Sequence, residues 1–170
     1  KGRKMSSITQ TSMVEHGIRR WWVLLITCVP LFMMMLDVTI VNIALPDIIK
    51  GFNTGLSSVE WVLNAYILTF AVLLITLGKL GDLYGRKLLF LGGLGLFTIS
   101  SLACGLAPNI TLLIVARVFQ AIGGAAMMPA TLSILNVAFG DRRGMALGIW
   151  GAVAGVAAAL GPIIGGALVD

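Results

Sequence analysis

Three long stretches without a charged residue constrain what this chain can fold into. No Asp, Glu, Lys or Arg occurs between Lys87 and Arg117, between Arg117 and Asp141, or between Arg143 and Asp170. Each stretch is long enough to cross a hydrocarbon core of about 30 Å at about 1.5 Å per helical residue. Because lipid cannot solvate backbone N–H and C=O groups, a chain in that core must be helical. The pattern predicts an all-α membrane protein.

The composition and the position of the charges support this interpretation. Of the 170 residues, 58% are hydrophobic and 11% are charged, which is more apolar surface than a water-soluble fold can bury. The net charge of +5 does not indicate nucleic acid, because all but one of the basic residues outside the apolar runs precede the first run or follow the second and fourth. This positive-inside pattern predicts a cytoplasmic N-terminus. The basic residues on the predicted inner side are Lys1, Arg3, Lys4, Arg19, Arg20, Lys79, Arg86, Lys87, Arg142 and Arg143.

The apolar runs divide into about five spanning helices after a polar tail of residues 1–20, which we expect to be mostly disordered. As one helix, the run from Leu88 to Phe139 would extend about 78 Å, so a break is predicted at the turn signal Ala107-Pro108-Asn109. A polar outer loop is expected after Pro46, with Ser57 or Ser58 capping the next helix. The predicted helices cover residues 21–45, 59–78, 88–106, 110–139 and 144–169.

Two ionisable residues, Asp37 and Arg117, are expected to lie inside the hydrocarbon. An unpaired charge in hydrocarbon costs several kcal/mol, so each is expected to face a cavity or a partner. Counted from Pro46 and Ile110, both lie about 10 to 13 Å below the outer surface. We therefore expect them at one central cavity, close enough to interact directly or through water, with Gln120 one helical turn from Arg117. A static structural ion pair is the alternative interpretation.

No metal site, cofactor or enzyme active site is expected. The spacing of Cys28 and Cys104 does not suggest a metal site or a disulfide, and His16 stands alone in the polar tail. The sequence lacks the phosphate-binding pattern G-x-x-x-x-G-K-[ST], so ATP-driven pumping by this segment is not supported. With one buried acidic residue expected, an intramembrane enzyme is also disfavoured.

Four segments resemble motifs of the major facilitator superfamily, in its drug/proton antiporter branches. LDVTIVNIALP at residues 36–46 is similar to the first-helix signature of multidrug exporters with fourteen spans, and GKLGDLYGRK at residues 78–87 resembles the general signature of the superfamily. LIVARVFQAIGGAA at residues 113–126 is similar to the fourth-helix signature, although Ala121 stands where glycine is usual. In the fifth predicted helix, where Ala157 replaces another expected glycine, the antiporter signature is matched by Gly148, Gly161, Pro162, Gly165 and Gly166.

The resemblance implies a secondary active transporter, specifically a proton-coupled antiporter in the cell membrane that exports drugs or other small molecules. A proton gradient would drive it, and its partners would be the lipid bilayer, a small-molecule substrate and the missing C-terminal helices of the same transporter. Asp37 would be a proton-titratable or cation-recognising carboxylate, and Arg117 would respond to its protonation state. The substrate and proton pathway would comprise Asp37, Arg117, Gln120 and Asn42.

The loop at residues 78–87 is expected to act as a conformational gate. The resemblance implies that Asp82, Arg86 and Asp141 form a charge network that locks one conformation, together with Gly78, Gly85 and Lys87. A solvated loop that merely obeys the positive-inside rule is the alternative. In the fifth helix, pairs of glycines four residues apart predict a groove for close helix packing, and Pro162 predicts a kink. These pairs are Gly144 and Gly148, Gly151 and Gly155, and Gly161 and Gly165.

Five spans would leave Asp170 outside, directly after an apolar run. We therefore expect the N-terminal portion of a larger transporter, because five helices cannot complete a six-helix bundle. The alternative is a truncated, non-transporting membrane fragment or a regulatory or assembly subunit.

Overall fold

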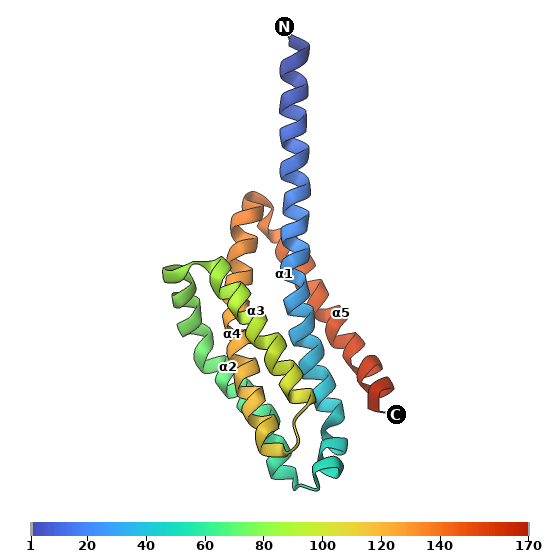
Figure 1. Cartoon of the computed structure of the whole chain (residues 1–170). Helices are drawn as coiled ribbons and strands as arrows, with labels where there is room; N and C mark the ends of the chain where they lie inside the picture. Colours follow the sequence, from blue (N-terminus) through green and yellow to red (C-terminus); the bar gives the residue numbers. More distant parts are fainter. Residues whose placement is uncertain (1, 170) are drawn as a thin grey trace.

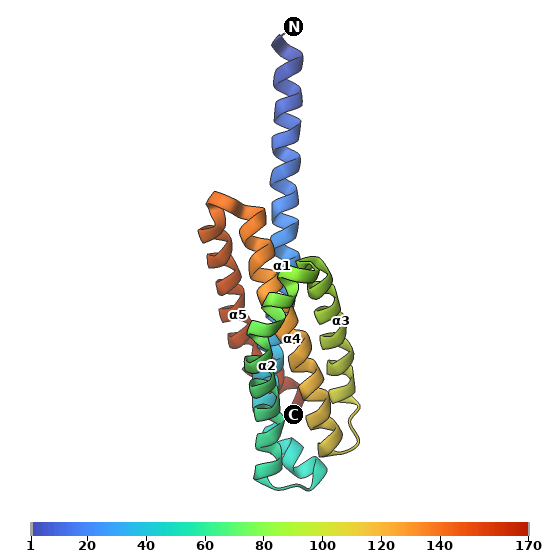
Figure 2. The same cartoon turned by 90° about the vertical axis from the view of Figure 1, so that its left-hand side faces the viewer.

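The computed structural model describes the backbone of residues 2–169 and the side chains of residues 20–166, and it contains five α-helices (Figures 1 and 2). No strand occurs in the part of the chain that is described, so the all-α prediction is confirmed. A 3-10 turn at Gly140–Arg142 separates the last two helices. The helices are α1 (Gly2–Phe52), α2 (Leu56–Tyr84), α3 (Arg86–Gly105), α4 (Ile110–Phe139) and α5 (Arg143–Val169).

Four continuous helical segments are long and apolar enough to cross a membrane, one fewer than the five predicted. The first three are Arg20–Phe52, Leu56–Tyr84 and Arg86–Gly105. The fourth, Ile110–Gly166, contains both α4 and α5, because the 3-10 turn joins them without a non-helical residue. The chain reverses direction at this turn, so α5 runs back alongside the bundle (Figure 1). By length and composition, the chain is therefore a multi-pass membrane protein.

The first helix is longer than predicted at its C-terminal end. It passes through Pro46 and ends at Phe52, so the expected outer loop shrinks to residues 53–55. A proline removes one N–H donor and weakens a helix, which is why a helix end was expected there. Asp47 and Lys50 lie 3.9 Å apart across the following turn, but both are exposed, so this pair contributes little.

At its N-terminal end, α1 begins at Gly2, where we expected a disordered tail. Extending an existing helix is easier than nucleating a new one, and Gly17 is the only helix-disfavouring glycine or proline between Arg3 and Arg20. The side chain of His16 lies outside the described residues.

The predicted serine cap of α2 is wrong, and the predicted break before α4 is confirmed. The N-cap of α2 is Gly55, which offers no side chain, so Ser57 and Ser58 lie inside the first turn. The α4 bounds match the prediction, and the side-chain oxygen of Asn109 accepts a hydrogen bond from the backbone N–H of Leu112 at 2.9 Å. This bond satisfies one of the unpaired donors at a helix start.

The connection between α2 and α3 is a single residue, Gly85, with φ of 98°. Residues that carry a side chain rarely adopt this conformation. Glycine therefore allows the chain to reverse within a single residue. The N–H of Gly85 donates to the carbonyl of Gly81 at 3.0 Å, which closes the end of α2. The predicted tight turn is confirmed, although α2 continues to Tyr84 and not only to Gly78.

Helix α4 lies at the centre of the bundle: α2 and α3 pack along it, and α5 packs along α1 (Figures 1 and 2). Glycines make the contact between α3 and α4 very close. A Cβ atom on Gly93 would lie 2.8 Å from the carbonyl oxygen of Gly123, and one on Gly123 would lie 2.6 Å from the backbone nitrogen of Phe97. The two backbones are therefore in direct contact, as small residues permit in membrane helices.

The glycine groove predicted on α5 is confined to one end of the helix. A Cβ atom on Gly161 would overlap the side chain of Thr39, and one on Gly165 would lie 3.1 Å from Ile43, so this pair packs on α1. A Cβ atom at the other predicted positions would meet nothing within 4 Å among the described residues. A spacing of four residues places two glycines on one helical face, but it does not determine whether another helix packs against that face. The other positions are Gly144, Gly148, Gly151 and Gly155. Gly166, which belongs to the antiporter signature, likewise meets nothing within 4 Å among the described residues.

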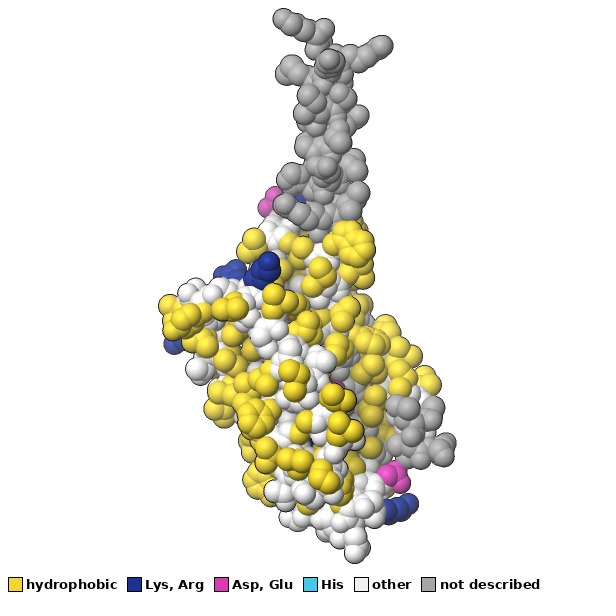
Figure 3. Space-filling model, in the orientation of Figure 1, with side chains coloured by type: hydrophobic (Ala, Val, Ile, Leu, Met, Phe, Trp, Pro, Cys, Tyr) yellow, Lys and Arg dark blue, Asp and Glu magenta, His cyan; other side chains and the backbone are white. Residues whose placement is uncertain are grey.

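The outer surface matches a lipid environment. On the face in Figure 3, hydrophobic side chains cover the length of the bundle, and most charged side chains gather near its ends. Val72 and Ile75 are 72% and 73% exposed, which would be costly in water. Trp21 and Trp22 are exposed beside Arg20, a combination typical of a membrane interface.

The contact between α3 and α4 generates a stability prediction. Gly93→Ala is expected to destabilise the bundle by about 1 to 3 kcal/mol, because the added methyl group meets backbone atoms that cannot move aside. Thermal unfolding in detergent measures this. Gly92→Ala is the matched control, since a Cβ atom there meets nothing within 4 Å, and equal melting temperatures for the two variants would contradict the close contact.

Candidate functional site

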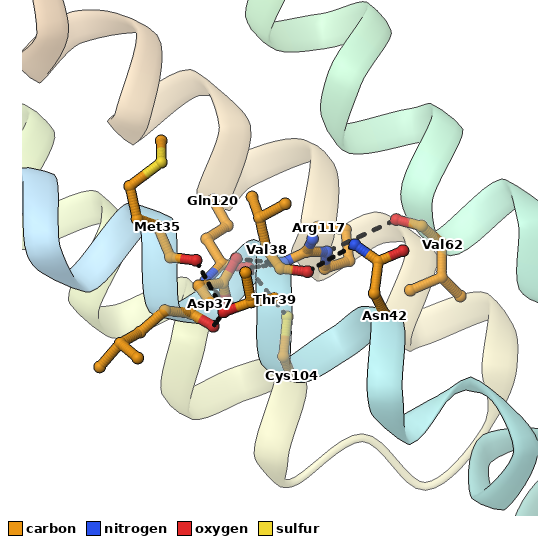
Figure 4. A network of polar contacts seen from close by, with 10 residues as sticks. Met35, Asp37, Val38, Thr39, Asn42, Val62, Cys104, Arg117 and Gln120 are labelled. Carbon is orange, nitrogen blue, oxygen red and sulfur yellow. Dashed lines mark hydrogen bonds and ion pairs between the residues drawn. The ribbon is translucent and has the colours of Figure 1, made fainter. Parts of the chain in front are cut away.

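The two charged residues inside the spans meet in the interior of the bundle (Figure 4). Arg117 on α4 donates from Nη1 to Oδ2 of Asp37 on α1 at 2.5 Å. Arg117 is only 1% exposed, whereas the side chain of Asp37 is 16% exposed. The predicted proximity of the two residues is confirmed, and it takes the form of a direct ion pair.

Gln120 closes this pair into a ring of three side chains. Its amide nitrogen donates to Oδ1 of Asp37 at 2.8 Å, and its amide oxygen accepts from Nη1 of Arg117 at 2.8 Å. Each carboxylate oxygen of Asp37 therefore has a partner. The Nε of Arg117 also points to the carbonyl oxygen of Val62 on α2, at 3.5 Å. A buried guanidinium needs such partners, because burying it without them is very costly.

Two further side chains complete the surroundings of the ion pair, and sequence reasoning missed both. The ring of Tyr66 on α2 faces Arg117, with the guanidinium carbon 4.4 Å from the ring centroid. The thiol of Cys104 on α3 donates to the amide oxygen of Gln120 at 3.5 Å. The four-residue spacing of Val62 and Tyr66 places them on one helical face, but no signal in the sequence shows which helix that face meets.

Asn42, the remaining predicted pathway residue, stays outside this network. It is exposed, and its amide nitrogen donates to the carbonyl of Val38 in its own helix at 2.7 Å. Asn42 lies five residues after Asp37, so the two side chains point to different faces of α1.

A cavity of about 320 Å³ lies beside Asp37, between α1 and α3. Arg117 is not among its lining residues, so the expectation that both charges face one cavity is met only for Asp37. The reason is that Arg117 is held back against α2 by Val62 and Tyr66. Asp37 is therefore the accessible member of the pair. The cavity is lined by Met33, Leu36, Asp37, Ile40, Val41, Phe97 and Ser101.

At the turn after α2, the structure brings together two of the three predicted gate charges. Arg86 donates from Nε and Nη2 to Oδ1 of Asp82 at 3.3 and 3.2 Å, and both side chains are exposed. Asp141 lies in the 3-10 turn and forms no ion pair with any side chain that the structure describes. An exposed pair of this kind contributes little to stability. Nearby, Lys87 and Arg86 line a cavity together with Arg20.

The structure also shows where three other predicted positions lie. Gly78 faces Pro129 of α4, with 3.5 Å between its would-be Cβ and that ring, and Gly85 forms the turn. Pro162 is exposed within α5. No group of three His, Cys, Asp or Glu side chains suited to a metal occurs among the described residues, and Cys28 and Cys104 are free thiols.

A double-mutant cycle on Asp37 and Arg117 tests the ion pair. Asp37→Asn or Arg117→Met alone is expected to cost about 3 to 5 kcal/mol, because each leaves a buried group without its partner. The double variant should cost clearly less than the sum of the two, which unfolding in detergent measures. Strictly additive losses would contradict a direct interaction.

Comparison with known proteins places this chain in a family. Residues 27–170 match the family model of the Major Facilitator Superfamily. An uncharacterised MFS-type transporter of Mycobacterium tuberculosis is 48% identical over 151 residues, covering 88% of this chain and 26% of that protein. The tetracenomycin C resistance and export protein of Streptomyces glaucescens is 45% identical over 153 residues, covering 89% and 28%. The methylenomycin A resistance protein of Bacillus subtilis is 41% identical over 169 residues, covering 98% and 36%.

A solved structure shares the fold. It is that of a bacterial homologue of the human lysosomal transporter Spinster, in an inward-facing and unoccupied conformation, with a TM-score of 0.78 and 26% identity. The match covers 88% of this chain and 32% of that one. The chain thus spans between 26% and 36% of the length of these relatives. Since the family model covers most of the sequence and the fold agrees, the chain belongs to the Major Facilitator Superfamily.

Proposed function

We propose that this chain is the N-terminal part of a proton-coupled antiporter that exports drugs or other small molecules across the cell membrane. The observation that carries the proposal is the Asp37–Arg117 pair, in which an accessible carboxylate is bonded to a buried cation deep in an apolar bundle. The names of relatives support export, since two of them are resistance proteins and one of these is also an export protein. The activity itself belongs to the whole transporter.

The geometry suggests how a proton and a substrate would compete for one site. A proton that enters the cavity beside Asp37 neutralises the carboxylate, and the ion pair with Arg117 loses one of its charges. Arg117 keeps its positive charge, because a guanidinium is not deprotonated in proteins. The bond that joins α1 to α4 is thereby weakened, and the two helices are freer to separate. A cationic or polar substrate that binds at Asp37 would instead displace the proton.

The proposed topology has five spans and a cytoplasmic N-terminus. α1 then leads outward, residues 53–55 lie outside, and Gly85 returns the chain at the inner surface. The 3-10 turn lies at the inner surface as well, and α5 forms the fifth span. The positive-inside rule supports this orientation, because Arg86, Lys87, Arg142 and Arg143 then all lie on the inner side.

The proposal includes a gate at the loop of residues 78–87 and a hinge in α5. The exposed Asp82–Arg86 pair would exchange partners with Asp141 or with helices of the missing half as the transporter changes conformation. In α5, Gly161 and Gly165 let the helix lie against α1, so this contact would be the pivot, with Pro162 beside it and Gly148 and Gly166 on the same helix.

A second candidate is a non-transporting membrane fragment or an assembly subunit. The observation in its favour is that the chain spans at most 36% of the relatives described above. Transport by the 170-residue chain alone, compared with transport by a chain that includes the downstream reading frame, distinguishes the two.

Asp37→Asn tests the transport mechanism. In the full-length transporter reconstituted in liposomes, a pH gradient should no longer drive substrate export by this variant, with at least a tenfold loss, because an amide cannot take up the proton. Asp47→Asn is the matched control, since Asp47 lies on the same helix, is exposed and pairs only with Lys50 among the described residues. Unchanged proton-driven export by Asp37→Asn would remove Asp37 from the mechanism.

The orientation is tested by labelling single cysteines in a background of Cys28→Ala and Cys104→Ser. In intact cells, a membrane-impermeant maleimide should label Ser57→Cys, which is exposed beside the outer turn. Arg142→Cys should be labelled only after the membrane is permeabilised. The opposite pattern would reverse the proposed topology.

A further inference from the structure

The ring of Tyr66 is a fixed surface beneath the guanidinium of Arg117. Tyr66 is 5% exposed, and the guanidinium carbon lies 4.4 Å from its ring centroid. Phe70 stacks on it one helical turn later, with centroids 6.1 Å apart and planes at 13°. On the other side, a Cβ atom on Gly124 would lie only 3.2 Å from the Tyr66 hydroxyl, so glycine at this position makes room for the ring.

This surface matters most when Asp37 is neutral. Arg117 then carries a full positive charge in a site where it is 1% exposed. Its remaining partners are the amide oxygen of Gln120, the carbonyl of Val62 and the face of Tyr66. An aromatic face attracts a cation by about 0.5 to 2 kcal/mol, with the larger values where water is excluded. The ring therefore stabilises Arg117 in place after the carboxylate has lost its charge.

We propose that Tyr66 is a positioning residue that holds Arg117 while Asp37 is protonated, and that it thereby sets the pH at which the transporter exchanges its proton. This inference rests on the proposed function. The ring contacts Arg117 in the ion-paired structure as well, so holding the cation does not by itself move the equilibrium. The negative face of the ring also disfavours a nearby carboxylate, and this effect favours the protonated state of Asp37. Removing the ring must shift the pH dependence of transport towards acid.

The titratable groups around the pair are few, which makes the pH profile interpretable. Asp37 comes from α1, Tyr66 from α2, Cys104 from α3 and Arg117 from α4. α5 brings no charged residue between Gly144 and Val169. Tyrosine and cysteine side chains ordinarily titrate above neutral pH, so a shift of the midpoint below pH 7 reports on the ion pair.

The test measures the pH midpoint of substrate export by the full-length transporter in liposomes. Tyr66→Leu is expected to move the midpoint towards acid by about half a pH unit, and Tyr66→Phe, which keeps the ring, to leave it unchanged. Phe70→Leu is the matched control: it removes the stacked ring but not the face under Arg117, so it should leave the midpoint in place.

A second series avoids the risk that Tyr66→Leu does not fold. Replacing Tyr66 with phenylalanines that carry increasing numbers of ring fluorines keeps the shape and weakens the negative face. The midpoint should then move towards acid in steps with fluorination. An unchanged midpoint throughout this series would overturn the proposal, as would equal shifts for Tyr66→Leu and Phe70→Leu. The proposed function would survive either result as long as Asp37→Asn still abolishes proton-driven export.

Discussion

The ion pair between Asp37 and Arg117 lies where contacts from the first four helices converge. A guanidinium that is 1% exposed in an apolar bundle is tolerable only because every neighbouring helix supplies it or its partners with a contact. α1 contributes the carboxylate, α2 the Val62 carbonyl and the Tyr66 ring, α3 the Cys104 thiol through Gln120, and α4 the arginine itself. The packing of the first four helices therefore also determines the surroundings of the ion pair.

Small residues allow the helices to approach closely enough for this packing. Gly93 and Gly123 bring the backbones of α3 and α4 into contact, and Gly124 leaves space for Tyr66 beside Arg117. A buried ion pair is weak evidence for stability, because hydrophobic residues of similar volume often serve as well or better. The exposed Asp82–Arg86 pair, with side chains 67% and 42% exposed, is screened by water and contributes less still. The proposed function gives the buried pair a role other than stability, because its charge would change as Asp37 takes up and releases a proton.

Much of this was predictable, and the failures have physical reasons. The bounds of α4 and the depth of Asp37 and Arg117 follow from helix length and from the Asn109 turn, which are local properties. The positions of Tyr66 and Cys104 beside the ion pair were not predicted. Helical periodicity shows which residues share a face, but not which helix packs against that face. The α5 glycines show the same limit, since only Gly161 and Gly165 meet another helix in the described bundle. The helix end predicted at Pro46 was wrong, because α1 continues through this proline to Phe52.

In the proposed mechanism, Asp37 gains a proton as substrate leaves and loses it as substrate binds. Infrared difference spectroscopy of the full-length transporter, with and without substrate, observes this directly through the C=O stretch of a protonated carboxyl group. Substrate binding should remove such a band, and the band should be absent in Asp37→Asn. A substrate-induced spectrum that is identical in the wild type and in Asp37→Asn would contradict this mechanism.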